Sequence, residues 1–335
     1  MSQIDLHEPS RHSTYAVIVK TYVWNSFVAR QVGRIAEKVG SGDVWVLVDE
    51  SRGRVEGITH SHVLRVTERD AVAYGLANAK TGDSLFWYCA DYLHYLFMDA
   101  RPDYAHYIFV EHDVVARIDF DTFVASLAAD GVDYVGTPVR TPIEAYPWLA
   151  GLLAVYGVEE LRCDLYCVAA FSNRAMRTLG AKRIEMSQTY ADGSLSFWPI
   201  GEIFVPTEVE RAGLHRRALE DYGDTTRYDW WPPFHEDDLH TMPTPSFAHP
   251  VLEGTSYLRS ALRHAGLKDW MRRGSPVRRG IERYGVPACM PHVFREVRRR
   301  SVESVKRRLE GIGLVPRWTA GIEGRLSGAR RTLQR

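Results

Sequence analysis

Tyr107-Ile108-Phe109-Val110 runs directly into Glu111-His112-Asp113, and this stretch is the clearest strand signal in the chain. Its first four residues are apolar and rich in β-formers, which is typical of a strand buried on both faces of a sheet. The next three residues place two carboxylates at positions i and i+2. A buried parallel strand that ends in acids delivers them to the carboxyl edge of the sheet, where open α/β folds bind ligands.

The residues before this strand predict a βαβ beginning. Tyr15–Val19 is a short apolar strand, Val23–Val39 has helical periodicity, and Val44–Val48 is a second apolar strand. Strand, helix and strand in this order predict parallel pairing with a right-handed crossover. Residues 62–66 form a further candidate strand, and 85–98 an aromatic-rich helix whose apolar face is expected to include Trp87.

The pattern after the acids continues the alternation of helices and strands. We expect a helix over 121–128, a short strand over 134–136, and a strand over 165–171 that leads through Ser172-Asn173-Arg174 into a helix to about residue 179. A helix beginning near Pro206 and ending at Gly213 is also expected. The predicted fold class is α/β, with a Rossmann-like, mostly parallel sheet flanked by helices and a C-terminal α-helical extension.

Composition excludes several classes of protein. The chain has 335 residues, 45% hydrophobic and 25% charged, which is typical of a soluble globular protein and excludes disordered, collagenous and disulfide-stapled chains. Four cysteines are too few and too irregularly spaced for a disulfide framework. Residues 1–12 are polar and lack the apolar segment of a signal peptide, so a cytoplasmic location is expected.

The zero net charge hides a division along the chain. Residues 251–335 carry 20 Lys+Arg against 7 Asp+Glu, whereas residues 1–250 carry 22 against 35. The basic part also contains apolar residues and breaks at Gly274-Ser275-Pro276, Pro287 and Pro316. Such helices can fold on the acidic body, lie peripherally on the anionic inner face of a membrane, or contact nucleic acid, the last being least favoured.

The acids after the central strand suit a metal site. Carboxylates at i and i+2 can bracket Mg²⁺ or Mn²⁺ while diphosphate oxygens complete the coordination. The competing interpretation of Glu111 and Asp113 is a solvated turn, in which acids are ordinary. Their place after the central strand favours the ligand site.

The order of these motifs resembles the GT-A fold glycosyltransferases over about residues 14–252. The resemblance lies in the strand ending at Asp49, the DxD-like Glu111-His112-Asp113, the Phe171–Arg174 segment, Glu202 before a helix and a late His249. The sequence departs from the family pattern in three places: Glu111 stands for the first Asp, Ala169-Ala170 replaces a glycine-rich run, and Ile203 follows Glu202 where a second acid is expected.

The resemblance implies a role for each matched position. Asp49 would contact the nucleotide base, while Glu111 and Asp113 would hold a divalent cation on the donor diphosphate. Arg174 would help to shape the donor pocket. Glu202 would act as general base, and His249 would complete the metal site.

Each of these positions also has a structural interpretation. Asp49 can simply begin a turn, and Glu202 can favour the amino end of its helix. A lone histidine such as His249 is often structural. Trp230 and Trp231 can stack on the sugar faces of an acceptor or anchor a loop by burial.

The sequence therefore predicts an N-terminal tail (1–13), a GT-A-like domain (14–252) and a basic helical extension (253–335). The predicted activity is glycosyl transfer from a nucleotide-sugar donor to a glycan or lipid-linked acceptor, with Mn²⁺ or Mg²⁺, in polysaccharide biosynthesis. Two alternatives stay open. One is a sugar nucleotidyltransferase, although the first strand leads into Lys20-Thr21-Tyr22 without a glycine-rich phosphate loop. The other is a non-catalytic protein that binds anionic polymers or membranes.

Overall fold

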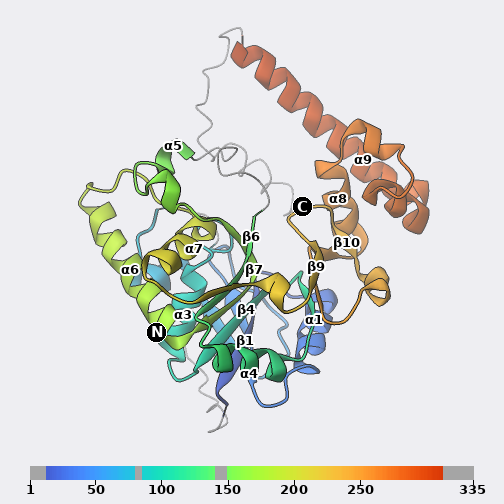
Figure 1. Ribbon diagram of the computed structural model, residues 1–335. Coiled ribbons are helices and arrows are strands. Elements are labelled where there is room, and N and C mark those ends of the chain that lie inside the picture. Colours follow the sequence, from blue (N-terminus) through green and yellow to red (C-terminus); the bar gives the residue numbers. More distant parts are fainter. Residues whose placement is uncertain (1–12, 80–84, 140–148, 312–335) are drawn as a thin grey trace. The chain divides into compact units, whose positions relative to one another are not determined.

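A computed structural model describes residues 13–79, 85–139 and 149–311 (Figure 1). These residues form two compact units. The first contains residues 13–139, 149–230 and 237–251, within the described ranges, and the second contains residues 231–236 and 252–311. Residues 1–12 of the predicted N-terminal tail lie outside the described residues. Pro316, a predicted break, lies outside them too.

The first unit is built on a seven-stranded sheet (Figure 1). All its strands run parallel except β7, which is antiparallel to both of its neighbours. The predicted fold class, a mostly parallel sheet with helices on its faces, is confirmed. In spatial order the strands are β3 (Val63–Val66), β2 (Asp43–Asp49), β1 (Tyr15–Thr21), β4 (His106–Glu111), β7 (Asp164–Ser172), β6 (Tyr134–Pro138) and β8 (Arg216–Ala218).

Both faces of the sheet are buried, as its unbroken apolar strands predict. Successive residues of a strand point to opposite faces, so Phe109 enters one hydrophobic cluster while Ile108 and Val110 enter another. The helices of the first face are α2 (Glu68–Ala73), α3 (Tyr92–Ala100), α6 (Asn173–Ala191) and α7 (Gly201–Arg211), and those of the second are α1 (Ser26–Ala36) and α4 (Phe120–Asp130). The same unit also contains a short helix, α5 (Leu149–Leu152).

Local signals fix the ends of the helices on the second face. The Asn25 side chain accepts a hydrogen bond from the backbone N–H of Val28 at 3.0 Å and caps α1. The Asp119 side chain caps α4 in the same way, accepting a hydrogen bond from the backbone N–H of Thr122 at 2.8 Å. Gly131, with φ 63°, ends α4 in the left-handed conformation that glycine adopts without steric cost.

Helix boundaries in three regions differ from the prediction. The aromatic-rich helix begins only at Tyr92, so Trp87 precedes it and is 54% exposed. Helix α6 continues to Ala191, well beyond residue 179. Helix α7 begins at Gly201 rather than near Pro206, because burial of Ile203, Phe204 and Val205 stabilises the early turns despite the proline.

A second, three-stranded sheet follows the acidic motif. Its order is β5 (Val115–Arg117), β11 (Ser246–His249) and β9 (Asp224–Tyr228). Strands β5 and β11 are antiparallel, with Ala248 opposite Val115. This pairing returns the chain to the acids from more than 130 positions further along the sequence. The remaining short elements of this unit are η2 (Val158–Glu160), η3 (Leu219–Asp221) and η4 (Glu236–Thr241).

The second unit is helical and has a small core of its own. Helices α8 (Gly254–His264) and α9 (Pro276–Gly311), with η5 (Leu267–Trp270) between them, bury Leu258, Leu262 and Val277. Short strands β10 (Phe234–His235) and β12 (Val251–Leu252) lie near the unit boundaries. No described helix combines the length and apolarity needed to cross a bilayer.

The predicted break of α9 at Pro287 is displaced. The helix bends at Gly285, whose φ is 78°, and continues through Pro287 and Pro291. Pro287 therefore lies in the first turn after the bend, where a missing N–H costs little. The predicted break at Gly274-Ser275-Pro276 is confirmed, since α9 begins at Pro276.

Candidate active site

Charged side chains from three parallel strands meet at the carboxyl edge of the main sheet. Lys20, Asp49 and Glu111 lie at the ends of β1, β2 and β4. The parallel register places Lys20 directly beside Glu111. This is the edge at which open α/β sheets bind ligands.

Lys20 is a buried cation that the sequence analysis did not assign to the site. It is fully buried, and its Nζ lies 3.4 Å from Oε1 of Glu111. The rings of Phe86 and Tyr166 lie 5.7 and 5.4 Å from the same Nζ. The sequence does contain a signal for this role, because Lys20 lies near the end of an otherwise apolar strand. A lysine buried there needs a charged partner, since lysine is almost never fully buried without one.

Asp113 and His249 face each other across the turn after β4. His249 Nε2 lies 3.6 Å from Oδ1 of Asp113. The backbone N–H of Val251 donates to the carbonyl of Asp113 at 2.7 Å, which fixes the returning chain beside the acidic turn. Oδ1 of Asp113 is buried and has no hydrogen-bond partner within the described structure.

The tautomer of His249 follows from its other nitrogen. Nδ1 lies 2.8 Å from the backbone oxygen of Asp229, an atom that can only accept a hydrogen bond. Nδ1 therefore carries a proton, which leaves Nε2, the ring nitrogen nearer Asp113, as the atom that could bind a metal. This arrangement, with one ring nitrogen fixed by a carbonyl, is the usual preparation of a histidine for metal binding.

Cys167 adds a sulfur atom to the same place. Ligand atoms of Glu111, Cys167 and His249 all lie within 4.8 Å of one another. Val168 of β7 pairs with Val110 of β4, so the preceding Cys167 lies opposite Glu111. Burial raises the pKa of the Cys167 thiol well above its usual value, and the charges of Glu111 and Asp113 add to that shift. The sequence analysis regarded this cysteine as a core residue, and it is buried.

Glu202 lies in the first turn of α7 and is partly buried. Burial raises its pKa to about 7, with a further contribution from the negative charge of Glu111. Its charge also contributes to the raised pKa of Cys167. Glu202 is therefore close enough to the acid cluster to interact with it electrostatically, and it titrates near neutral pH.

The position of α7 depends on a buried ion pair. Arg183 Nε donates to Oδ2 of Asp91 at 2.6 Å, and both side chains are fully buried. Arg183 Nη2 also donates to the carbonyl of Pro199 at 2.9 Å, just before α7. A Cβ on Gly201 would lie 2.0 Å from the hydroxyl of Tyr166 and 2.7 Å from Oδ1 of Asp91, so only glycine fits at the helix start.

Asp49 lies at the end of β2 and is buried. Its Oδ1 accepts a hydrogen bond from the backbone N–H of Ser51 at 2.9 Å, as in an Asx turn. Its Oδ2 is buried without a hydrogen-bond partner among the described residues. Burial raises the pKa of Asp49, although hydrogen bonds from Ser51 and from the backbone of Leu85 and Phe86 oppose that shift. The turn interpretation thus explains Oδ1, and the backbone of Leu85 and Phe86 also faces this carboxylate.

The predicted donor-pocket residue Arg174 is not brought to this cluster. Because β7 is antiparallel to β4, Ser172 pairs with His106 at the opposite end of β4 from Glu111. Arg174 follows it there, and its guanidinium binds Asp133. Its position therefore argues against donor binding. Trp230 is 55% exposed and directly follows Asp229, whose carbonyl lies 2.8 Å from Nδ1 of His249. Trp231 packs in the core of the second unit.

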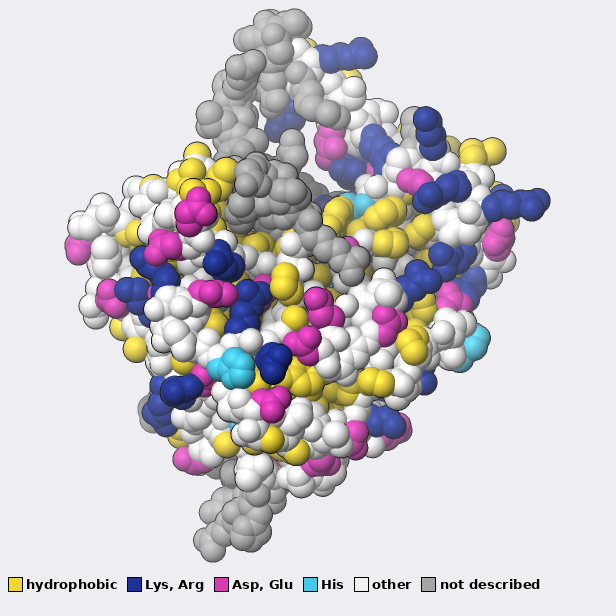
Figure 2. Space-filling view, viewed as in Figure 1, with side chains coloured by type: hydrophobic (Ala, Val, Ile, Leu, Met, Phe, Trp, Pro, Cys, Tyr) yellow, Lys and Arg dark blue, Asp and Glu magenta, His cyan; other side chains and the backbone are white. Residues whose placement is uncertain are grey.

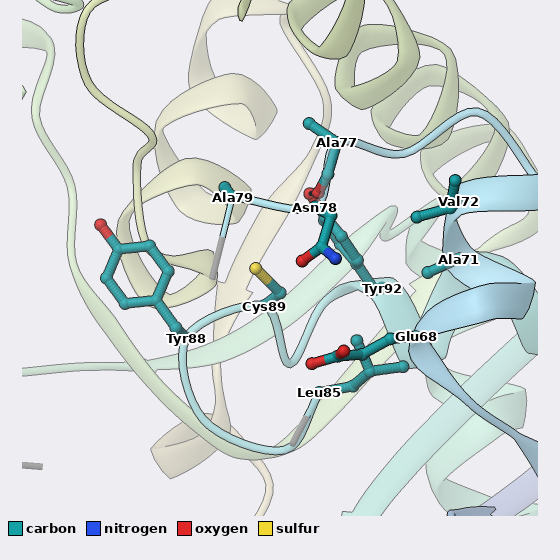
Figure 3. A pocket seen from close by; sticks show the side chains of 10 residues that line it. All are labelled: Glu68, Ala71, Val72, Ala77, Asn78, Ala79, Leu85, Tyr88, Cys89 and Tyr92. Atoms are coloured by element: carbon teal, nitrogen blue, oxygen red, sulfur yellow. Dashed lines mark hydrogen bonds between the residues drawn. The ribbon is translucent and has the colours of Figure 1, made fainter. Parts of the chain in front are cut away.

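A separate small pocket lies between α2 and the residues that lead into α3 (Figure 3). Its walls are mostly apolar, with Leu85, Cys89 and Tyr92 on one side and Ala71 and Val72 of α2 on the other. No predicted site residue lines it. The chemistry expected from the sequence therefore belongs to the sheet edge and not to this pocket.

Similarity to known proteins is found among solved structures. No family model and no curated protein matches the sequence. Among solved structures, the chain is similar to a glycosyltransferase involved in glycosylation of the major capsid of PBCV-1, at 8% identity and a TM-score of 0.33 over 62% of this chain and 83% of that one. It is also similar to mouse xyloside xylosyltransferase 1 in its apo form, at 9% identity and a TM-score of 0.41 over 71% of this chain and 97% of that one. The described first unit is a mostly parallel α/β fold, with its acidic motif at the carboxyl end of β4.

Proposed function

We propose that the protein is a glycosyltransferase that moves a sugar from a nucleotide-sugar donor to a glycan or lipid-linked acceptor. One observation carries the proposal: Glu111, Asp113 and His249 converge at the carboxyl edge of the sheet, in electrostatic contact with Glu202. This places a candidate diphosphate-metal site beside a candidate base.

The donor atoms fit a divalent cation. Carboxylate oxygens of Glu111 and Asp113 and the Nε2 lone pair of His249 are ligands that Mn²⁺ accepts, and Mg²⁺ suits the two carboxylates. The unpartnered Oδ1 of Asp113 supports the same assignment, because a buried carboxylate oxygen is costly to leave without a partner. When bound, the cation would neutralise charge on the diphosphate leaving group.

Lys20 adds a second positive charge at this edge. Its ammonium group faces Glu111 and is close enough to His94 to help lower the pKa of that histidine, after the larger effect of burial. A buried ammonium group beside the site would stabilise negative charge on donor phosphates. It would also compensate part of the repulsion between Glu111 and Glu202.

Glu202 suits the base role in the proposed reaction. A general base works best when its pKa lies near the working pH, and burial raises the pKa of Glu202 to about 7. Its carboxylate would take the proton of the acceptor hydroxyl as that oxygen attacks the anomeric carbon. Asp49 would contact the nucleotide, and exposed Trp230 would stack on an acceptor sugar.

A thermal-shift screen tests the proposal directly. The intact protein would be heated with each nucleoside diphosphate, with and without Mn²⁺, alongside Asp113→Asn and the matched variant Asp103→Asn, which changes an exposed acid elsewhere. We expect one nucleotide to stabilise the wild type and the Asp103 variant only with Mn²⁺, and Asp113→Asn to lose that effect. Absence of any response would favour the non-catalytic binding protein instead.

Transfer itself requires a second readout. Once the nucleotide is known, release of the nucleoside diphosphate from its sugar conjugate would be measured for wild type and Glu202→Gln. A large loss in kcat with unchanged donor affinity is expected if Glu202 is the base. Turnover close to the wild type would remove Glu202 from that role and leave the metal site untouched.

A further inference from the structure

Helix α9 carries an apolar face that the described residues of its unit leave exposed. Val286, Phe294, Val297 and Val305 are separated by eight, three and eight residues, spacings that put them on one side of a helix. Val302 lies three residues before Val305 and borders the same side. These five residues, called the outer face here, are between 46% and 65% exposed.

The side of α9 that adjoins Val286 and Val297 packs against the rest of the unit. Cys289 and Val293 pack in the core of the unit, and Arg300 donates to the backbone oxygens of Leu262 and Ala265 at 2.8 Å each. The apolar surface of the helix is therefore broader than the strip that packing in the unit buries. A helix that needed only to pack on α8 would not require the exposed remainder.

Charge is segregated around the helix. The acidic side chains Glu296 and Glu303 lie away from the outer face, where Arg299 binds both of them at 2.6 Å. On the outer face, exposed Arg298 lies in one row between Phe294 and Val302. Figure 2 shows Lys and Arg side chains interspersed with hydrophobic ones over this unit.

We infer that the outer face of α9 docks onto an anionic lipid bilayer, lying in the plane of the interface. Phe294 and the valines would enter the boundary of the acyl chains, while Arg295, Arg298 and Arg308 would contact lipid phosphates. Positive charge without acids on the outer face provides complementarity to anionic headgroups. A nucleic-acid site would use the arginines but has no need of exposed valines and phenylalanine. This inference does not depend on the proposed transferase activity.

Vesicle flotation of the full-length protein tests the inference. Vesicles of phosphatidylcholine alone would be compared with vesicles that also contain phosphatidylglycerol, for wild type and two double variants. We expect Phe294→Ser with Val305→Ser to lower the partition coefficient on anionic vesicles about tenfold. Arg298→Gln with Arg308→Gln should lower it by a similar factor and remove the preference for the anionic lipid.

Matched controls separate the outer face from general surface effects. Val72→Ser with Val158→Ser changes two valines of the first unit that are about as exposed, 51% and 48%. Arg69→Gln with Arg217→Gln removes two exposed arginines there. Both controls should partition like the wild type, and circular dichroism should show that every variant keeps its helix content.

Three results would overturn the inference. The first is equal partitioning of wild type and both α9 variants. The second is binding to double-stranded DNA that depends on the arginines but not on Phe294 or Val305. The third is a dimer in sedimentation velocity, without lipid, that the Phe294→Ser and Val305→Ser changes dissociate, because a second copy of the chain would then cover the face.

Discussion

Removal of one partner of the Asp91–Arg183 pair should destabilise the first unit strongly. The Arg183 guanidinium lies 3.7 Å from the ring centroid of Phe204 and has no exposed surface. Arg183→Met preserves most of the apolar stem but leaves the Asp91 carboxylate buried without its counter-charge. Breaking a buried pair in this way costs about 3–5 kcal/mol.

That cost should be visible as a change in melting temperature. For a unit of this size, each kcal/mol corresponds to roughly 2–4 °C, so Arg183→Met should lower the Tm by about 10 °C. The matched control is the neighbouring exposed pair on α6, Lys182 and Glu185, whose Nζ and Oε1 lie 2.9 Å apart. Lys182→Met should change the free energy of unfolding by no more than about 0.5 kcal/mol.

A double variant separates the cost of an unpaired charge from lost packing. Asp91→Leu combined with Arg183→Met removes both charges and keeps apolar volume, so it should recover most of the stability lost in Arg183→Met. Urea unfolding at neutral pH, followed by circular dichroism, measures all four proteins. The reasoning would be refuted if Arg183→Met unfolded at the same urea concentration as Lys182→Met, or if the double variant were no more stable than Arg183→Met.

Three further predictions concern the site. Because the folded pKa of Glu202 is raised to about 7 from 4.5, the fold binds its proton more tightly than the unfolded chain does, and wild-type stability should fall as pH rises between these values. Urea unfolding of Glu202→Gln across this range should show no such slope and a gain of about 3 kcal/mol at pH 8. Cys167→Ser should reduce stabilisation by Zn²⁺ more than stabilisation by Mn²⁺ in thermal shift, because a thiolate favours the softer ion; equal losses would show that the sulfur is not a ligand. Gly201→Ala should displace the start of α7 and lower turnover more than Gly33→Ala, whose added Cβ meets no atom within 4 Å; equal turnover of these two variants would contradict the close packing at Gly201.

Periodicity and strand order were sufficient to predict the main sheet and part of the site. Asp49 and Glu111 each close an apolar strand, and parallel strands necessarily bring such ends to one edge. The approach of His249 to Asp113 depends on the pairing of β11 with β5, which no local pattern encodes. Only the family resemblance indicated that these two residues belong together.

Lys20 and Cys167 were missed because their residue types have common structural roles. A lysine after an apolar strand usually reaches solvent, and a cysteine in a strand is usually a small core residue. What distinguishes both is their position opposite Glu111 on the two neighbouring strands. Arg174 was assigned to the site because motif order does not specify whether a strand runs parallel or antiparallel to its neighbour.

The reversed direction of β7 has a practical consequence for attempts to alter the specificity of this protein. In a strand parallel to β4, residues 172–174 would line the chemistry, and a saturation library would be placed there. In the actual strand the entry end, from Asp164 to Cys167, lies nearest Glu111, and the exit end anchors a helix on the far side. Directed evolution should therefore randomise the first residues of β7 and keep its last residues fixed as scaffold.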